Sequence, residues 1–312
     1  MSATASVASQ RRRTAFGAWS SVTRRLPAYL LVLPTVLLIA TFVWYPLLRA
    51  GQVSLYQWDG VGALGKFVGA STYQHLFLED PIFRNALRNT LLWAAMYTAI
   101  PTVIGLAVAL LVDSEVRGEA LFKGAIFLPW AISPVVVGFI WTQMYNPSSG
   151  LIDGVLRGIG LGGLARAWLA DGSLALPAIN LAASWVRTGF AMIVFLAALR
   201  GIPSDLIEAA RIDGAGLRQG IWYIVLPLLR PAFTVVIGTS LMLSMGAFDE
   251  VWVMTKGGPG FSSYLLAVYL YISTFQTHQA GVGAAIGVVM FLLAAVGGFV
   301  YVRQMIRGEV TY

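Results

Sequence analysis

Six long apolar segments constrain the fold of this chain more than any other feature. Each is about twenty residues long, which is the length that an α-helix needs to cross the hydrocarbon of a bilayer. Only 11% of the residues are charged, against ~25% in ordinary soluble domains. The pattern predicts an all-α integral membrane protein with six transmembrane helices, at residues 28–50, 89–112, 122–146, 174–199, 231–254 and 280–303.

The two ends of the chain are predicted to be polar tails. Residues 1–27 are rich in Ser, Ala, Thr and Arg, which predicts a disordered basic tail. The apolar run that follows is too long for the h-region of a signal peptide, so we expect an uncleaved first span. The membrane domain is therefore predicted to cover residues 28–303, with a short tail at 304–312.

The distribution of basic residues predicts the orientation. With the N-terminus inside, the cytoplasmic segments hold thirteen Lys and Arg residues and the outer segments seven. Basic residues favour the cytoplasmic side, so both termini are predicted to be cytoplasmic in a multi-pass protein of a bacterial-type cytoplasmic membrane. The same bias accounts for the net charge of +7, and we expect the lipid bilayer, not nucleic acid, as the partner.

The outer loops are predicted to have some structure of their own. Residues 51–88 should include a short surface helix near 72–77, and residues 151–161 should form a small amphipathic piece. Residues 262–276 are apolar, but this length suits an interfacial or re-entrant segment better than a span.

One charged loop, residues 200–230, separates the fourth and fifth spans. Asp205 is predicted to cap a helix, with Glu208 three residues later completing a capping box. Gly214 should end that helix, and a second helix should run from about Gly216 to Pro227. The loop is thus predicted to be a helix–turn–helix at the cytoplasmic membrane surface.

The spacing within this loop resembles the EAA loop of binding-protein-dependent ABC importer permeases. That pattern is EAA, three residues, G, nine residues, I, one residue, LP, and every fixed position is present. In that family the loop is a coupling helix that docks on a cytoplasmic ATPase. The resemblance therefore implies a coupling role for Glu208, Ala209, Ala210, Asp213, Gly214, Ala215, Ile224, Leu226 and Pro227.

The resemblance extends along most of the chain and points to the sugar branch, the maltose-type or glycerol-phosphate-type permeases. It implies the type I ABC importer permease fold, here in the F-like member of a permease heterodimer. The implied partners are a second homologous permease, a dimer of ABC ATPase subunits that uses ATP and Mg, and an extracytoplasmic solute-binding protein. The supporting segments are Phe67-Val68-Gly69, Asn89-Thr90-Leu91, Leu128-Pro129-Trp130, Tyr145-Asn146-Pro147, and Phe248-Asp249 with Gly257-Gly258-Pro259.

The family resemblance also implies that the fourth and fifth spans line the solute pathway. Sugar sites combine aromatic faces with a few placed polar groups. Residues of these types on the two spans are Trp185, Arg187, Phe190, Ser244, Phe248, Asp249 and Trp252. The solute is expected to be a mono-, di- or oligosaccharide or a related polyol. A non-sugar solute such as glycerol phosphate or a polyamine is the alternative.

Arg187, Asp249 and Glu250 are charged residues well inside predicted spans. Such residues usually face a cavity or a partner. Two interpretations remain open from the sequence: Arg187 pairs with Asp249 or Glu250 across the cavity mouth, or all three lie near the outer interface and extend to water.

Several glycines and prolines are predicted to shape helix contacts. Gly105, Gly138 and Gly238 should lie at helix–helix contacts, and Gly283 and Gly287 have the GxxxG spacing of packing against another span. Pro101 should kink the second span, and Pro129 and Pro134 the third.

Enzymatic function is disfavoured. The chain has no cysteine, and its two histidines, His75 and His278, lie about 200 residues apart with no metal-ligand spacing. No phosphate-binding Gly-rich loop occurs, so no catalytic residue, metal or bound cofactor is expected. An ion-coupled secondary transporter, a remoter alternative, would be expected to show mid-span acidic residues and internal repeats, and neither is visible.

Overall fold

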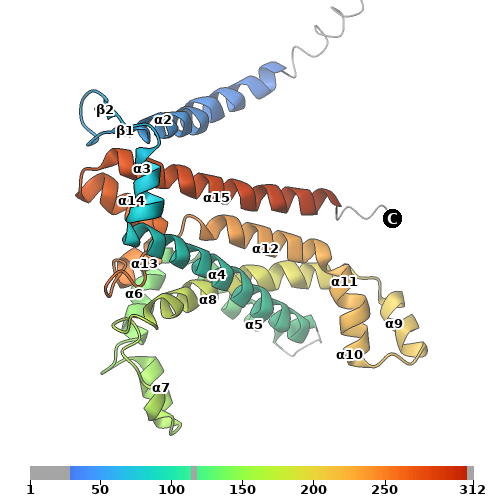
Figure 1. Ribbon diagram of the computed structural model, residues 1–312. Coiled ribbons are helices and arrows are strands. Elements are labelled where there is room, and N and C mark those ends of the chain that lie inside the picture. Colours follow the sequence, from blue (N-terminus) through green and yellow to red (C-terminus); the bar gives the residue numbers. More distant parts are fainter. Residues whose placement is uncertain (1–28, 114–117, 308–312) are drawn as a thin grey trace, which may run out of the picture. The chain divides into compact units, whose positions relative to one another are not determined.

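The computed structural model describes residues 29–113 and 118–307 (Figure 1). The predicted tail at 1–27 and the last residues of the C-terminal tail, 308–312, lie outside the described residues. The chain divides into two compact units, Met1–Gln52 and Val53–Tyr312. An apolar helix, described from Tyr29, passes along the first unit and ends at Val53, with a π-helical section η1 (Ala40–Trp44) followed by α2 (Tyr45–Val53).

The remaining spans belong to the second unit. Over the described residues, four helices, including Tyr29–Val53, are long and apolar enough to cross a membrane, and six if each of two bent pairs counts as one span. The six-span fold predicted from the sequence is thereby confirmed. The long helices of the second unit are α4 (Pro81–Asp113), α8 (Ala175–Arg200) and α15 (Ala280–Arg307).

The third span is broken by its prolines. Helix α5 (Glu119–Phe127) continues into the 3₁₀ turn η3 (Leu128–Ala131), and α6 (Pro134–Met144) then departs at 107°. Ile132 and Ser133 between them have extended backbone, with ψ of 136° and 139°. The residue before a proline disfavours helical ψ, so Pro134 accounts for the break immediately before it.

The fifth span differs from the continuous helix expected at 231–254. A short stretch, α10 (Leu217–Gly220), η5 (Ile221–Val225) and α11 (Leu226–Leu228), meets α12 (Arg230–Ser244) at 64°. Helix α12 then ends at Ser244, and α13 (Asp249–Met254) is separate. Gly246, which has poor helix propensity, lies in the gap, and Phe248 has an extended φ of −141°.

The second span begins earlier than the expected residue 89. The Asp80 carboxylate accepts hydrogen bonds from the amides of Ile82 (2.8 Å) and Phe83 (3.0 Å). It therefore caps α4 at Pro81, because these amides have no partner within the helix. The sequence reasoning placed the boundary by hydropathy alone and missed this polar first turn.

Helix α8 is at the centre of the packing in the second unit. It contacts α4, α5, α6, α12 and α13, and Figure 1 shows α4, α8 and α12 side by side. Gly105 of α4 permits this approach, because an added Cβ would lie 2.6 Å from the Cβ of Ala191. The predicted contact roles hold for Gly138, which meets Val253 of α13, and for Gly238, which meets Tyr301 of α15.

The outer segments contain short elements. The strands β1 (Tyr56–Gln57) and β2 (Lys66–Phe67) pair antiparallel, which the sequence did not suggest. The predicted surface helix is present as α3 (Ser71–Gln74) with η2 (His75–Glu79), and the amphipathic piece as α7 (Leu151–Gly158) with η4 (Gly162–Leu164).

The apolar segment near 262–276 is a short helix, α14 (Leu266–Tyr271) with η6 (Ile272–Gln276), below the length of a span. Gly283 and Gly287 pack against it, because an added Cβ would meet Thr274 and Leu270. Their GxxxG spacing therefore accommodates this outer segment and not another span as predicted.

Candidate functional site

The charged loop forms the predicted helix–turn–helix. Helix α9 (Ser204–Ile212) is followed by a turn at Gly214, whose φ of +86° lies in the left-handed region and stops the helix. The amide of Ala215 donates to the carbonyl of Ala210 (2.9 Å) and that of Gly214 to Arg211 (3.1 Å), which is the Schellman arrangement. A second helical stretch follows from Leu217. Figure 1 shows α9 and α10 standing apart from the packed helices.

The predicted capping box at Asp205 is wrong. Helix α9 begins at Ser204, after Pro203, without a side-chain cap. Asp205 therefore lies inside the first turn, where its negative charge is favourable for the helix dipole, and its carboxylate caps no amide. Half of such a box occurs one helix later, where the side-chain oxygen of Gln219 accepts from the amide of Gly216 (2.8 Å), but Gly216 has no side chain to complete it.

This segment exposes large apolar side chains. Ile212 is 86% exposed and Tyr223 79%, and Leu217 and Trp222 are exposed as well. A hollow of about 300 Å³ lies among Asp213, Gly214, Ala215, Gln219, Tyr223 and Ile224. Exposed apolar groups around a hollow are typical of an interaction surface. Of the other predicted coupling residues, Glu208, Ala209 and Pro227 are exposed, and Ala210 and Leu226 are half-buried.

Arg187 of α8 is buried, with 1% of its surface exposed. Its Nε donates to the hydroxyl of Ser240 (3.0 Å) and its Nη2 to that of Thr239 (2.5 Å), both on α12. The guanidinium carbon also lies 4.1 Å from the centroid of the Phe190 ring and 5.2 Å from that of Trp130.

Neither open interpretation of Arg187 matches these contacts. No ion pair joins its side chain to Asp249 or Glu250 within 4.0 Å, and the side chain does not extend to water. A charge at the centre of a membrane costs about 2.5–3.5 kcal/mol on insertion scales. Two hydroxyls and two aromatic faces offset part of that cost, since cation–π contacts contribute about 0.5–2 kcal/mol each.

Apart from Phe190, the predicted pathway residues make contacts elsewhere and do not cluster with Arg187. Phe248 and Trp252 stack at 5.5 Å and both contact Tyr271 of α14. Trp185 contacts Trp141 edge to face, the Ser244 hydroxyl bonds its own helix at Leu241, and Asp249 is exposed.

Four further members of these contacts were not predicted from the sequence: Trp130, Thr239 and Ser240 around Arg187, and Tyr271 beside Phe248 and Trp252. Only Trp130 carried a local signal, since it lies between the two prolines of the broken span.

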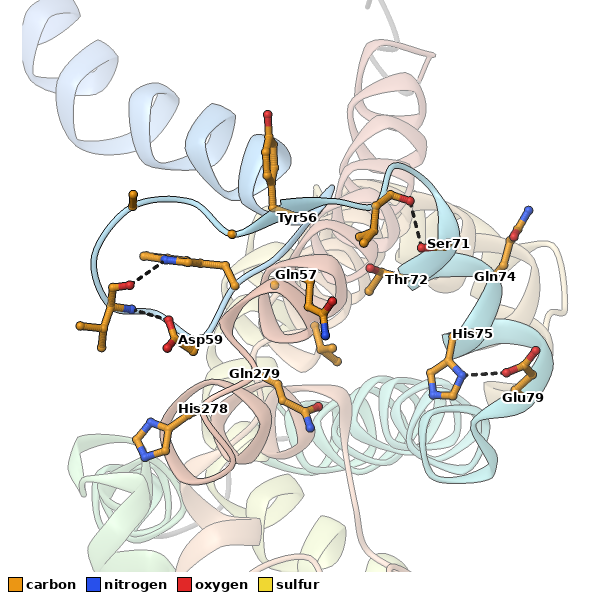
Figure 2. Close-up of a pocket in the computed structure, with 17 residues that line it drawn as sticks. Tyr56, Gln57, Asp59, Ser71, Thr72, Gln74, His75, Glu79, His278 and Gln279 are labelled. Carbon is orange, nitrogen blue, oxygen red and sulfur yellow. Dashed lines mark hydrogen bonds and ion pairs between the residues drawn. The ribbon is translucent and has the colours of Figure 1, made fainter.

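A pocket of about 930 Å³, on the side predicted to be outside, lies among three segments distant in sequence: the β1–β2 hairpin, α3 with η2, and the turn before α15 (Figure 2). The amide of Gly281 donates to the carbonyl of Trp58 (3.0 Å), which ties two of these walls together. His75 forms an ion pair with Glu79 (2.9 Å). Figure 2 shows His75 and His278, the two histidines of the chain, on different walls of the pocket.

Three amides of this pocket, those of Gln57, Gln74 and Gln279, make no side-chain hydrogen bond within the described residues. The nearby end of α4 is held by Tyr269, whose hydroxyl donates to Asp80 (2.5 Å). Burial, and then the bond to Asp80, raise the pKa of Tyr269, so the hydroxyl remains a donor at neutral pH.

A group of ionic side chains lies where α8 ends and the charged loop begins. Arg200 contacts Asp113 at 3.8 Å and also pairs with Glu119, which in turn pairs with Lys123. These side chains link the ends of α4, α5 and α8. Within residues 29–113 and 118–307, no three His, Cys, Asp or Glu side chains are grouped to hold a metal ion.

Comparison with known proteins gives a consistent result. Residues 101–305 match the family model described as "Binding-protein-dependent transport system inner membrane component". A probable ABC transporter permease of Pyrococcus horikoshii is 36% identical over 90% of this chain and 96% of its own length.

Two further relatives have named solutes. The diacetylchitobiose uptake permease NgcF of Streptomyces coelicolor is 33% identical over 81% of this chain and 75% of its own. The sulfoquinovosyl glycerol permease SmoG of Agrobacterium fabrum is 32% identical over 91% and 92%. In structure, a chain of a bacterial alginate ABC importer superposes with a TM-score of 0.78 at 23% identity, covering 94% of this chain and 99% of that one. That superposition confirms the fold.

Proposed function

We propose that this chain, which belongs to the family of binding-protein-dependent inner membrane transport components, moves a sugar or related polyol into the cytoplasm. It is an integral membrane permease subunit of an ABC importer. The observation that carries the proposal is the exposed helix–turn–helix at 204–228, which has the spacing of a coupling element and an apolar, hollowed surface. The names of two relatives, which transport diacetylchitobiose and sulfoquinovosyl glycerol, support a carbohydrate solute.

The partner at the coupling segment is a cytoplasmic ATPase subunit. Ile212, Leu217 and Tyr223 offer apolar area for burial, and the hollow beside Gly214 can receive a side chain of the partner. ATP and Mg are used by that subunit and not by this chain. A second, homologous permease completes the membrane part as a heterodimer, with both termini of this chain in the cytoplasm.

The outer pocket is the contact for the solute-binding protein. It opens on the side opposite to the coupling segment in the predicted topology, and its free amides supply donors and acceptors for a protein surface. Its walls come from separate elements joined by backbone hydrogen bonds, so the surface is formed before the partner arrives.

The two sides are connected by α8 and α12, which flank the coupling segment. Closure of the ATPase dimer on ATP would draw the coupling segments of the two permeases together. Helix α8 leads directly into the coupling segment at Arg200. A displacement of that segment therefore shifts α8, and with it Arg187 and the aromatic residues that line the pathway. The cavity then opens outward to receive the solute.

The proposal is tested by reconstituting this chain with the permease, ATPase and binding protein encoded beside it. A thermal-shift screen of the binding protein names the solute, and uptake into proteoliposomes is then measured with and without ATP. We expect ATP-dependent uptake of a sugar or polyol. Stabilisation of the binding protein by a polyamine and by no sugar would refute the carbohydrate assignment. Uptake by this chain alone under an ion gradient would refute ATP coupling.

A further inference from the structure

The strongest unexplained feature of the membrane interior is a buried positive charge without a negative partner. Arg187 lies midway along α8, and no carboxylate within the described residues comes within 4.0 Å of its guanidinium. A guanidinium has five N–H donors, and only two are used, by Ser240 and Thr239. The guanidinium carbon also lies over the rings of Phe190 and Trp130.

The position of this charge links it to the solute pathway. The guanidinium lies where α8, α12 and the broken third span meet: Ser240 is on α12, and Trp130 is in the 3₁₀ turn before the break. Interrupted membrane helices commonly form solute sites at the midplane, because their free backbone ends can face the solute. Gly189, the residue immediately before Phe190, lets the broken third span approach α8, since an added Cβ would meet the carbonyl of Ile126 at 2.5 Å.

Two helix ends of opposite polarity meet at the break: the carboxyl end of η3, which carries Trp130, and the amide end of α6, whose first amides have no side-chain cap. Because these ends oppose each other, the positive charge available to an anion is that of the guanidinium itself. Asp249 and Glu250 lie in the first turn of α13 and form no ion pair with Arg187 within 4.0 Å.

We infer that the translocated solute carries an anionic group, a carboxylate, phosphate or sulfonate, which Arg187 binds at the midplane once the Trp130 and Phe190 rings move aside. This inference rests on the proposed function and narrows it. An acidic sugar or a phosphorylated polyol satisfies it, whereas a polyamine does not, because a buried guanidinium repels a cation. An uncharged aromatic and hydroxyl site would have sufficed for a neutral sugar.

The test is equilibrium binding to the purified complete complex, held with ATP in its outward-open state by a hydrolysis-deficient ATPase subunit. Two matched pairs of probes each compare the affinity of an anion with that of its neutral counterpart: galacturonate with galactose, and glycerol 3-phosphate with glycerol. We expect at least one anion to bind about tenfold to a hundredfold more tightly than its neutral partner, as one charge-assisted contact provides. The pair that shows the preference distinguishes an acidic sugar from a phosphorylated polyol.

Variants of Arg187 distinguish binding from a merely structural role. Arg187→Gln should abolish the preference for the anion, and Arg187→Lys should retain part of it. A structural defect would weaken both members of a pair equally and leave their ratio unchanged. Arg303→Gln, which removes an exposed positive charge from α15, is the matched control and should leave the ratio as in the wild type.

Four results would overturn the inference. They are equal binding of anion and neutral probe, no binding of either anion, a preference that survives Arg187→Gln, and recovery of Arg187→Gln by removal of an acidic residue of the second permease. The last result would identify that acid as the partner of Arg187. ATP-dependent uptake of a neutral sugar in the same preparation would leave the proposed function intact while refuting the anionic solute.

Discussion

The coupling segment and the Arg187 cluster solve opposite physical problems. The coupling segment leaves apolar side chains such as Ile212 and Tyr223 in the open, and its shape depends on bonds between residues near in sequence. The Arg187 cluster buries a charge and takes its members from three elements, α8 itself, α12 and the 3₁₀ turn η3. The first surface is therefore specified by local sequence and leaves its apolar side chains uncovered, whereas the second is specified by tertiary packing.

The largest effect is expected where local backbone geometry shapes the coupling segment. Gly214→Val places a β-branched side chain at a φ of +86°, which costs about 1–2 kcal/mol or more and unwinds the turn between the two helices. We expect ATP-dependent uptake to fall to background, as measured in proteoliposomes, with loss of the ATPase subunit on gel filtration.

The matched control for this substitution is Gly220→Ala in the same segment. No atom lies within 4 Å of an added Cβ there, and φ is ordinary. Uptake should be retained. Full activity of Gly214→Val would show that the turn does not position a docking surface.

The second-largest effect is expected at Arg187, where two substitutions distinguish the contribution of the charge to stability from that of the side-chain volume. Arg187→Ala leaves a cavity beneath Trp130 and Phe190 and strands the Ser240 hydroxyl, which should destabilise the chain by about 2–4 kcal/mol. Arg187→Met fills most of the space without the desolvated charge, and should change stability by less than about 1 kcal/mol. Thermal unfolding of the detergent-solubilised complex measures both. Equal losses in the two variants would mean that the charge itself stabilises the fold.

This contrast also explains which parts of the molecule the sequence could predict. The helix–turn–helix follows from Gly214 and a spacing readable over some twenty residues, and only its capping residue was misassigned. Spans were predictable from hydropathy, but the polar start of α4 at Asp80 and the separation of α13 from α12 were not. The partners of Arg187 could not be predicted from the sequence. Opposite charge favoured Asp249 as the partner, whereas the fold places the hydroxyl of Ser240 beside the guanidinium.

The third prediction concerns the close packing of α4 against α8. In Gly105→Ala the new Cβ would lie 2.9 Å from the backbone nitrogen of Met192, so α4 and α8 must separate. We expect a loss of about 1–3 kcal/mol of stability, as in other overpacked contacts. Gly124→Ala, with open space around the site, should be neutral or slightly stabilising, since Ala favours a helix over Gly by about 1 kcal/mol. Similar melting temperatures for both variants would contradict the close approach of α4 and α8.

The smallest effect is expected at Arg200, which lies between the two regions. Its contacts with Asp113 and Glu119 join the ends of three helices, but all three side chains are substantially exposed. Exposed ion pairs contribute about 0–1 kcal/mol because solvent screens them. Arg200→Gln should therefore lower stability by less than about 1 kcal/mol and leave uptake near the wild-type rate, with Lys256→Gln as a control for the loss of an exposed charge. A large loss of uptake with unchanged stability would instead show that these ion pairs transmit movement. If Arg200→Gln keeps its uptake, the movement that the proposed function requires is carried by the continuous backbone of α8. That helix holds Arg187 at its middle and leads into the coupling segment at its end.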